Sequence, residues 1–308
     1  MINKTVVCIG AILIDECFTS FENPLLSTSN PANYFRSSGG VAGNIANHLA
    51  LLGQNVELIS HFGNDIDGQR LMERCRANGI GISHSIVNDF DTGRYVAILS
   101  PNGELFAGAM SSHFESAITI TYLKTKTSLF KSASILQIDC NLSTDCLKWL
   151  LEFCDKEKIP CIVEPVSIPK ASRLTLTSIQ NVLLITPNLE EMIAMSGLVG
   201  KGNPEDVIQI LLERGVKNLW IRNGKKGSKI FTQDSAFELA SPLVNVVDTT
   251  GAGDAALAGW IYAWLKEKSP EKCLLYGHSM ASIILQIKGA VQENLTSEIL
   301  EKTVENYS

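Results

Sequence analysis

The sequence lacks three features that would place the protein outside the ordinary globular class. Its longest apolar run, residues 255–265, falls far short of the ~18 residues that a transmembrane helix needs. It has no excess of positive charge, since 26 basic and 32 acidic residues leave a net charge of −6, and no low-complexity tract interrupts it. We therefore expect no membrane or nucleic-acid partner, and a small molecule is the better default.

The sequence also lacks the spacing typical of metal sites. Its eight cysteines form no C-x-x-C pair and its five histidines are dispersed, which argues against a structural zinc. Several cysteines lie in apolar, strand-like runs, so buried reduced thiols are expected. Residues 1–4 lead directly into a predicted strand without an apolar targeting segment, which favours a cytoplasmic protein.

Short apolar runs alternate with amphipathic segments along most of the 308 residues. Strands are predicted at 6–9, 56–60, 82–87, 135–138, 161–163 and 182–185, and helices at 45–52, 68–78, 144–156, 189–195, 204–214 and 270–287. This alternation predicts an α/β fold with a doubly wound, mostly parallel sheet flanked by helices. The length suits one domain over residues 1–308.

Two segments depart from this alternation. Residues 94–99 and 105–109 are strand-like and flank Ser-Pro-Asn-Gly, which predicts a hairpin. Residues 29–38 carry another strand-like run. Strands inserted at about 29–38 and 92–112 would form a small sheet apart from the main one.

The most informative stretch is Val-Asp-Thr-Thr-Gly-Ala-Gly-Asp-Ala-Ala at residues 247–256, which reads as a tight turn into a buried helix. The first N–H groups of a helix lack partners, so Gly251, Ala252 and Gly253 offer donors to an anion such as phosphate. Asp254 beside that anion fits a base that takes a proton from an attacking hydroxyl. The pattern favours phosphoryl transfer, with a simple capping acid as the alternative.

A dinucleotide fingerprint is a weaker alternative for the same stretch. Gly251, Gly253 and Ala256 satisfy the loose pattern G-x-G-x-x-G/A. That pattern belongs in a first βαβ unit with an acid at the end of the next strand, about twenty residues on. Here it lies near the C-terminus and residues 270–275 read as helix, so we do not favour it.

Further polar residues follow predicted strands, where ligands of open α/β sheets gather. Asp15 follows the first strand and can accept hydrogen bonds from a sugar diol. Gly39 and Gly40 permit close backbone approach, and Asn44 offers a donor and an acceptor to a hydroxyl. Asp139 and Asn141 follow a later strand, where Asp139 can meet a sugar or a base.

The string Asp-Thr-Thr-Gly-Ala-Gly-Asp at 248–254 resembles the C-terminal signature of the ribokinase-like (PfkB) kinases, which phosphorylate hydroxymethyl groups of sugars and nucleosides with MgATP. The resemblance implies that Asp254 is the general base. Gly39, Gly40 and Asn44 match the family's Gly-Gly-x-x-x-Asn motif, which grips the sugar. It also implies that the small sheet is a lid, which covers the sugar and can supply a homodimer contact.

The resemblance extends to the nucleotide. Asn188 and Glu191 match the family's Asn-x-x-Glu motif, which acts through water and Mg²⁺ on the phosphates. Gly224 and Gly227 match its turn for the ATP phosphates, and Gly253 would face them. His278 lies where the family lines its adenine pocket, although a lone helical histidine is often structural.

The same family ligates a monovalent cation, K⁺, near its signature. Asp248, Thr250 and Gly289 match positions of that site, so K⁺ is a third expected ligand beside ATP and Mg²⁺. Arg222 departs from the family pattern, because Thr or Ser is usual at its place.

Other stretches narrow the substrate. Residues 29–31, 39–46, 138–143, 164–167 with Lys170, and 291–296 together resemble the pseudouridine kinases of the family. This implies phosphate transfer to the 5′-hydroxyl of pseudouridine, with another nucleoside or a ribose-like sugar as the alternative. A non-catalytic ligand-binding relative is less favoured, because Asp254 and its turn are intact. Candidate partners of the uracil base are Ser111, Ser112, His113, Asn141 and Lys170. Other departures are from the pattern of the family's pseudouridine kinases: Gly43 stands where a basic residue is common, Glu164 stands where Asp is common, and Gln292-Glu293-Asn294 replaces a Val-Asn-Pro-like string.

Overall fold

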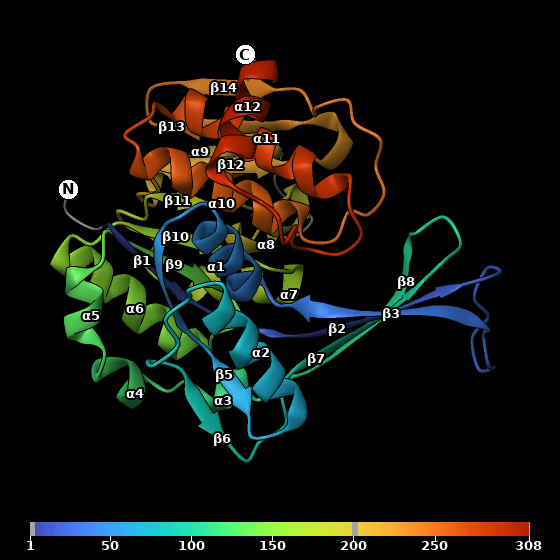
Figure 1. The fold of residues 1–308 in the computed structure, drawn as a ribbon. Helices are drawn as coiled ribbons and strands as arrows, with labels where there is room; N and C mark the ends of the chain where they lie inside the picture. The colour runs from blue at the N-terminus through green and yellow to red at the C-terminus, as the bar shows by residue number, and fades with distance from the viewer. Residues whose placement is uncertain (1–3, 199–202, 308) are drawn as a thin grey trace.

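The computed structural model describes residues 4–198 and 203–307 of the chain. Residues 1–3, which the sequence placed ahead of the first strand, lie outside the described residues, as do 199–202 and 308. Figure 1 shows a main sheet with helices on both faces and a small sheet that projects from this body. Among the described helices, none has the length and apolar character needed to cross a membrane.

The main sheet has eight strands in the order β14-β13-β12-β11-β10-β9-β1-β4. Its parallel strands are β1 (Thr5–Ile9), β4 (Asn55–Ile59), β9 (Ile135–Asp139), β10 (Cys161–Glu164), β11 (Leu184–Ile185) and β12 (Asn218–Arg222). The strands β13 (Ser228–Thr232) and β14 (Ala236–Leu239) add an antiparallel edge. The expected doubly wound, mostly parallel sheet is confirmed.

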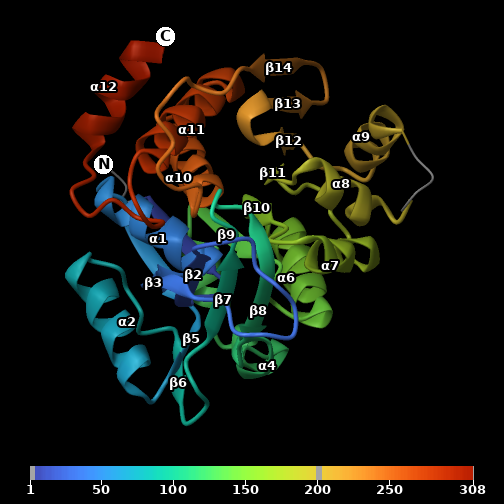
Figure 2. The same ribbon diagram turned by 90° about the vertical axis from the view of Figure 1, so that its right-hand side faces the viewer.

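Alternate residues of the central strands pack into two separate hydrophobic cores, one on each face of the main sheet. On β1, Val6 and Cys8 pack on one face of the sheet, whereas Val7 and Ile9 pack on the other. The first face is covered by α1 (Val41–Leu51), α10 (Ala252–Leu265) and α11 (Pro270–Leu285), with α12 (Ser297–Tyr307) against α11. The second is covered by α6 (Thr144–Glu157), α8 (Leu189–Ser196) and α9 (Pro204–Glu213), as the turned view in Figure 2 shows.

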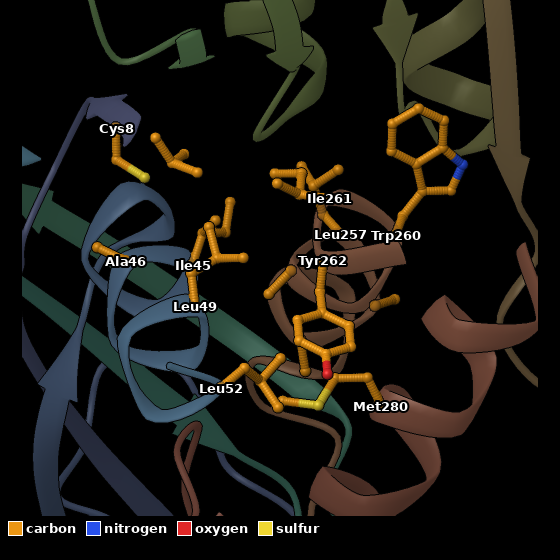
Figure 3. Packing of buried hydrophobic residues seen from close by; sticks show 14 of the residues in the cluster. Cys8, Ile45, Ala46, Leu49, Leu52, Leu257, Trp260, Ile261, Tyr262 and Met280 are labelled. Carbon is orange, nitrogen blue, oxygen red and sulfur yellow. The ribbon is translucent and has the colours of Figure 1, made fainter. Parts of the chain in front are cut away.

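Helix α10 is central to the first core. Its residues Leu257, Trp260 and Ile261 are buried; Leu257 and Ile261 lie on the side of Ile45 and Leu49 of α1, whereas Trp260 points away from α1 (Figure 3). Burial of each such side chain contributes about 1.5–3 kcal/mol. The core thereby fixes the starts of α1 and α10 relative to each other, and these two helix starts carry Asn44 and Asp254.

Some elements differ from the sequence prediction. The predicted strand at 82–87 is wrong in its extent and its place: β6 (Ile86–Asn88) pairs only with β5 (His61–Gly63), in a two-stranded sheet beside α2 (Ile66–Ala77). The sequence analysis also missed α12 and the short helices α3 (Phe114–Ala117), α4 (Ile120–Lys124) and α5 (Thr127–Ser132). Each of α3, α4 and α5 is too short for a helical period to show in the sequence.

The small sheet has the order β3-β2-β7-β8. It contains the expected strands β3 (Ala32–Gly39), β7 (Arg94–Leu99) and β8 (Leu105–Ser111), together with β2 (Leu13–Ser20), which was not predicted. Asp15 therefore lies on a strand opposite Ser37, not in a loop. An ion cluster ties this sheet to α2, since Arg36 and Arg94 both contact the buried carboxylate of Asp67.

Candidate active site

The starts of α1 and α10 meet at a direct hydrogen bond. The Asn44 side-chain amide (Nδ2) donates to Oδ2 of Asp254 over 2.8 Å. Burial raises the pKa of Asp254 to about 7, against the hydrogen bond from Asn44, which lowers it. A carboxyl group with a pKa near neutrality is suited to accept a proton at physiological pH.

The turn before α10 carries open backbone donors, although not the full set that was expected. Gly251 caps the helix with a φ of +72°, where a Cβ would approach Ala290 Cα to 2.8 Å. The Ala252 N–H already donates to the Thr249 carbonyl over 3.3 Å. Among the described residues, the N–H groups of Gly253 and Asp254 have no acceptor, since the first bond into the helix leaves from Ala255. The anion-binding donors thus centre on Gly253.

The sugar-side residues form a close cluster around Asp15. A Cβ on Gly39 would lie 2.0 Å from the Asp15 carboxylate, so only glycine leaves room for this acid. Gly40 caps α1 with a φ of +90°, and its missing side chain makes room for the Ala11 carbonyl. Burial and, secondarily, the charge of Asp248 raise the pKa of Asp15 to about 6. The structure brings Asp15, Gly39 and Gly40 together as expected.

Asp139 occupies a different place from the one expected for a substrate ligand. Its side chain is fully buried and accepts hydrogen bonds from the N–H groups of Ala11 (2.9 Å), Ala42 (3.3 Å) and Asn141 (2.9 Å). Burial raises its pKa to about 6, and these hydrogen bonds oppose that rise. Asp139 therefore holds the turn after β1 against the start of α1, and presents no open oxygen to a ligand.

The candidate base-recognition residues separate into two places. Lys170, on α7 (Ile168–Ala171), donates to the side-chain oxygen of Asn141, and its Nζ lies 3.6 Å from the sulfur of Met110 on β8. Burial lowers the pKa of Lys170. His113 instead stacks on Phe90, with ring centroids 4.7 Å apart. Lys170 thus contacts both Asn141, which follows β9 of the main sheet, and Met110 of the small sheet.

A cavity of about 460 Å³ has Gly253 and Arg222 in its wall. Its wall includes the turn from Gly224 to Gly227, the loop from Ser241 to Val246, and Ala281 on α11. This volume falls within the roughly 300–1,000 Å³ typical of small-molecule sites. The lining of the cavity is mostly apolar and includes Gly253 with its open N–H donor, a combination that fits a nucleotide.

Two residues that the sequence analysis did not single out fix His278 in this wall. The Trp220 indole donates to Ser228 Oγ over 2.7 Å, and Ser228 Oγ lies 2.6 Å from His278 Nε2. Burial lowers the pKa of His278 to about 4, so the imidazole that contacts Ser228 is neutral. The sequence offered no signal for this series of hydrogen bonds, because Trp220, Ser228 and His278 lie on three separate elements.

Asn188 and Glu191 are joined at the start of α8. The Asn188 side chain accepts from the Glu191 N–H, and Glu191 Oε2 accepts from the Asn188 N–H, each over 2.9 Å. Burial raises the pKa of Glu191. Across residues 4–198 and 203–307, no three His, Cys, Asp or Glu side chains gather to hold a metal ion. This donor set fits Mg²⁺ held by phosphates and waters, and does not form a protein cage.

The three expected cation ligands are brought together by Asp248. One carboxylate oxygen accepts from the Thr250 N–H (2.9 Å) and hydroxyl (2.8 Å), and the other accepts from the Gly289 N–H (2.9 Å). These bonds lower the pKa of Asp248 against its burial. The cluster combines the negative charge of Asp248 with the Thr250 hydroxyl, and both groups suit a monovalent cation.

The sequence matches the pfkB family of carbohydrate kinases over residues 3–297. It is 29% identical to the pseudouridine kinase of Escherichia coli K12 over 308 residues, covering 98% of this chain and 96% of that protein. It is 24% identical to a guanosine-inosine kinase of Exiguobacterium acetylicum, over 97% and 99% of the two chains. The Arabidopsis thaliana ribokinase complexed with ribose and ATP superposes with a TM-score of 0.79 at 22% identity, covering 99% of each chain. The chain belongs to the pfkB family of carbohydrate kinases.

Proposed function

We propose that this kinase transfers the γ-phosphate of ATP to the 5′-hydroxyl of pseudouridine, with Asp254 as the general base. The observation that carries the proposal is the place of Asp254. It directly follows Gly253, which lines the cavity, its carboxylate accepts the hydrogen bond from Asn44 on α1, and the charge of Asp15 contributes to raising its pKa. A hydroxyl bound on the Asp15 side would face a phosphoryl group bound at Gly253.

The groups of the chain divide the chemistry among them. Asp254 accepts the proton of the attacking hydroxyl, and Asn44 holds its carboxylate in place. The Gly253 N–H, at the positive end of α10, stabilises charge that develops on the transferred phosphoryl group. Mg²⁺, when bound with the nucleotide near Glu191, neutralises part of the phosphate charge. Asp15 and the backbone of Gly39 and Gly40 orient the ribose.

The pKa of Asp254 sets an expected pH dependence. Because the base must be ionised to accept a proton, kcat/KM should fall as pH drops below about 7, with a second, smaller contribution from Asp15 near pH 6. Initial rates at constant ionic strength measure this. Removing the hydrogen bond in Asn44→Ala should move the acidic limb to higher pH, since that bond lowers the pKa of Asp254. A profile that is flat down to pH 5 would contradict this role.

The choice of pseudouridine rests on similarity and on one polar pair. Similarity to the E. coli pseudouridine kinase extends over nearly the whole chain, and it supports a nucleoside over a simple sugar. Lys170 and Asn141 supply a donor and an amide at the edge of the site, next to Met110 of the small sheet. A site that hydrogen-bonds one base edge rejects analogues that lack the matching group.

A substrate panel tests the proposed acceptor. At saturating MgATP, kcat/KM for pseudouridine should exceed the values for uridine, adenosine, ribose and fructose 6-phosphate by more than about tenfold. Lys170→Met should narrow the preference for pseudouridine over uridine and leave the affinity for ATP unchanged. If uridine or ribose matches pseudouridine within tenfold, the acceptor is a broader class of nucleosides or sugars.

We also propose that K⁺ binds at Asp248, Thr250 and Gly289. The charge of Asp248 raises the pKa of Asp15, so a cation there would relieve repulsion between two acids of the site. Replacing K⁺ by tetramethylammonium at equal ionic strength should lower kcat, and Asp248→Asn should abolish the difference. Equal activity of the wild type in both buffers would argue against the cation.

A further inference from the structure

Arg222, which departs from the family pattern, and Glu164, which departs from the pseudouridine-kinase pattern, form an ion pair. Arg222 ends β12 and reaches across β11 to Glu164, which ends β10. Its Nη2 donates to both carboxylate oxygens, over 2.8 and 2.9 Å, and to the Thr186 carbonyl over 2.5 Å. The two side chains retain only 19% and 6% of their exposure.

Both carboxylate oxygens of Glu164 accept hydrogen bonds, and they fix Nη2 of Arg222. The same carboxylate also accepts from the Thr186 hydroxyl and, over 3.4 Å, from the Val166 N–H. Within the described residues, every side-chain hydrogen bond of Arg222 leaves from Nη2. The rest of the guanidinium, with its other N–H groups, is free to face a ligand.

The side of the guanidinium that carries Nη1 faces Gly253 in the wall of the cavity. Nη1 lies 2.7 Å from the position that a Cβ on Gly253 would occupy, and Arg222 lines the same cavity as Gly224 and Gly253. Its positive charge reaches both functional acids, since it lowers the pKa of Asp254 and the pKa of Glu191. Arg222 therefore stands between the general base and the acid expected near the metal.

A purely structural ion pair explains these facts less well. Burying an ion pair costs several kcal/mol per ion in desolvation, and an apolar pair of similar volume is often as stable. A tie between β10 and β12 would not require a cation whose second nitrogen touches an anion-binding turn. Arginine suits this position because its planar fork can bind a carboxylate with one edge and a phosphate with the other.

Resting on the proposed kinase function, we propose that Arg222 is a catalytic residue whose Nη1 binds the γ-phosphoryl group of ATP during its transfer. Glu164 is a positioning residue that fixes the other side of the guanidinium. The contact moves no proton and breaks no bond in the protein; it adds a positive charge where a relative with Thr or Ser would offer a neutral hydroxyl. Affinity for a nucleotide triphosphate should depend on Arg222 more than affinity for the diphosphate does.

Arg222→Thr tests this assignment, because it installs a residue that is usual in the family. The variant should lose about 10- to 150-fold in kcat, the range that one hydrogen bond to a charged group supports. Calorimetry should show that it binds the non-hydrolysable analogue AMP-PNP more weakly, with the affinity for ADP nearly unchanged. In Arg222→Ala, added guanidinium ion should restore part of the lost rate. Arg74→Thr, which removes a half-buried arginine on α2, serves as the matched control and should keep full activity.

Glu164→Gln separates positioning from folding. It keeps the shape and an acceptor for Thr186 but removes the negative partner of Arg222, so it should lower kcat and the preference for AMP-PNP over ADP together. Two results would overturn the proposal: a loss below about threefold in a folded Arg222→Thr, or a loss in kcat with the AMP-PNP preference intact and no rescue by guanidinium. If Arg222→Thr does not fold, the affinities of Arg222→Lys and Glu164→Gln for AMP-PNP and ADP are compared instead. A preference for AMP-PNP equal to that of the wild type in both variants would overturn the proposal.

These outcomes differ from failure of the proposed function. If the wild type transfers phosphate from ATP to no acceptor of the panel, the kinase assignment fails, whereas the comparison of AMP-PNP with ADP is still measurable. A wild type that phosphorylates an acceptor normally, beside an Arg222→Thr variant with unchanged kcat and AMP-PNP preference, removes only the role of Arg222.

Discussion

Replacing Asp254 by Asn is expected to lower kcat by about 10²–10⁴-fold, the contribution of a positioned general base. Asn has the same shape and keeps an oxygen that can accept the hydrogen bond from Asn44, which spans 2.8 Å in the wild type. It cannot take a proton from the attacking hydroxyl. Nucleotide binding should survive, because the cavity is lined by other residues. Steady-state kinetics with MgATP, together with calorimetric ADP binding, measures both effects.

The control for this prediction is Asp234→Asn, which makes the same change in the exposed turn between β13 and β14. It should leave kcat and the melting temperature unchanged. Retention of more than half the wild-type rate by Asp254→Asn would remove this residue from the role of base and favour a simple capping acid at the start of α10.

The stability of the same variant separates lost chemistry from lost folding. Burial raises the pKa of Asp254 from 3.8 to about 7, so the folded protein favours the protonated acid. Relative to an uncharged residue, the stability due to this acid is fully present below about pH 4 and is lost as pH rises through about 7. Asp254→Asn should therefore melt at a higher temperature than the wild type at pH 8, and the gap should shrink toward pH 4.

Much of the fold was predictable because buried parallel strands read as nearly continuous apolar runs. Strands β1, β4, β9 and β10 were found in this way. Strand β2 was missed because Glu16 to Thr19 are only partly buried and mix polar with apolar residues, and because its strand character comes from pairing with β3 and with the distant β7. Such pairing leaves little local signal.

The site, like the fold, was predictable where its signal is local in the sequence and not where it depends on distant contacts. Asp254 and its glycines are contiguous in the sequence and mark their chemistry there, whereas the partner of each functional group lies far away. Asn44 meets Asp254 across 210 positions, and Arg222 meets Glu164 across 58. The sequence marked Arg222 and Glu164 only as separate departures from a pattern. Asp139 accepts hydrogen bonds from the backbone N–H groups of Ala11 and Ala42, which are distant in sequence, so no local motif could predict these contacts.

Gly253→Ala is expected to lower kcat by roughly 10²–10³-fold, comparable to the loss of one donor in an oxyanion hole. The new methyl group would stand at the mouth of the turn, 2.7 Å from Arg222 Nη1, where the phosphoryl group must approach. The backbone should tolerate it, because Gly253 lies in the first turn of α10 and its φ is not positive. Ala is also favoured over Gly in a helix by roughly 0.5–1 kcal/mol. Activity should fall in a protein that is as stable as the wild type.

The matched control is Gly79→Ala, after α2, which has a φ of +76° and nothing within 4 Å of an added Cβ. Alanine is strained at a positive φ, so this control should lower the melting temperature and keep full turnover. Gly253→Ala should thus be the more stable but less active variant, and Gly79→Ala the less stable but more active one. This contrast excludes general destabilisation as the cause of the lost activity in Gly253→Ala. Normal kcat in a folded Gly253→Ala would exclude the phosphoryl group from this turn.

The methyl group of Gly253→Ala can act in two ways, and a double mutant with Arg222→Thr separates them. If it acts by pushing the guanidinium aside, the double mutant should be no slower than Arg222→Thr alone. If it blocks the Gly253 N–H itself, the two losses should multiply, because independent contributions add in free energy. We expect multiplication, since a flexible arginine tip can move away from a methyl group whereas the backbone donor cannot. Equal rates for Arg222→Thr and the double mutant would leave Arg222 as the group that binds the phosphoryl oxygen, with no part for the backbone of the turn.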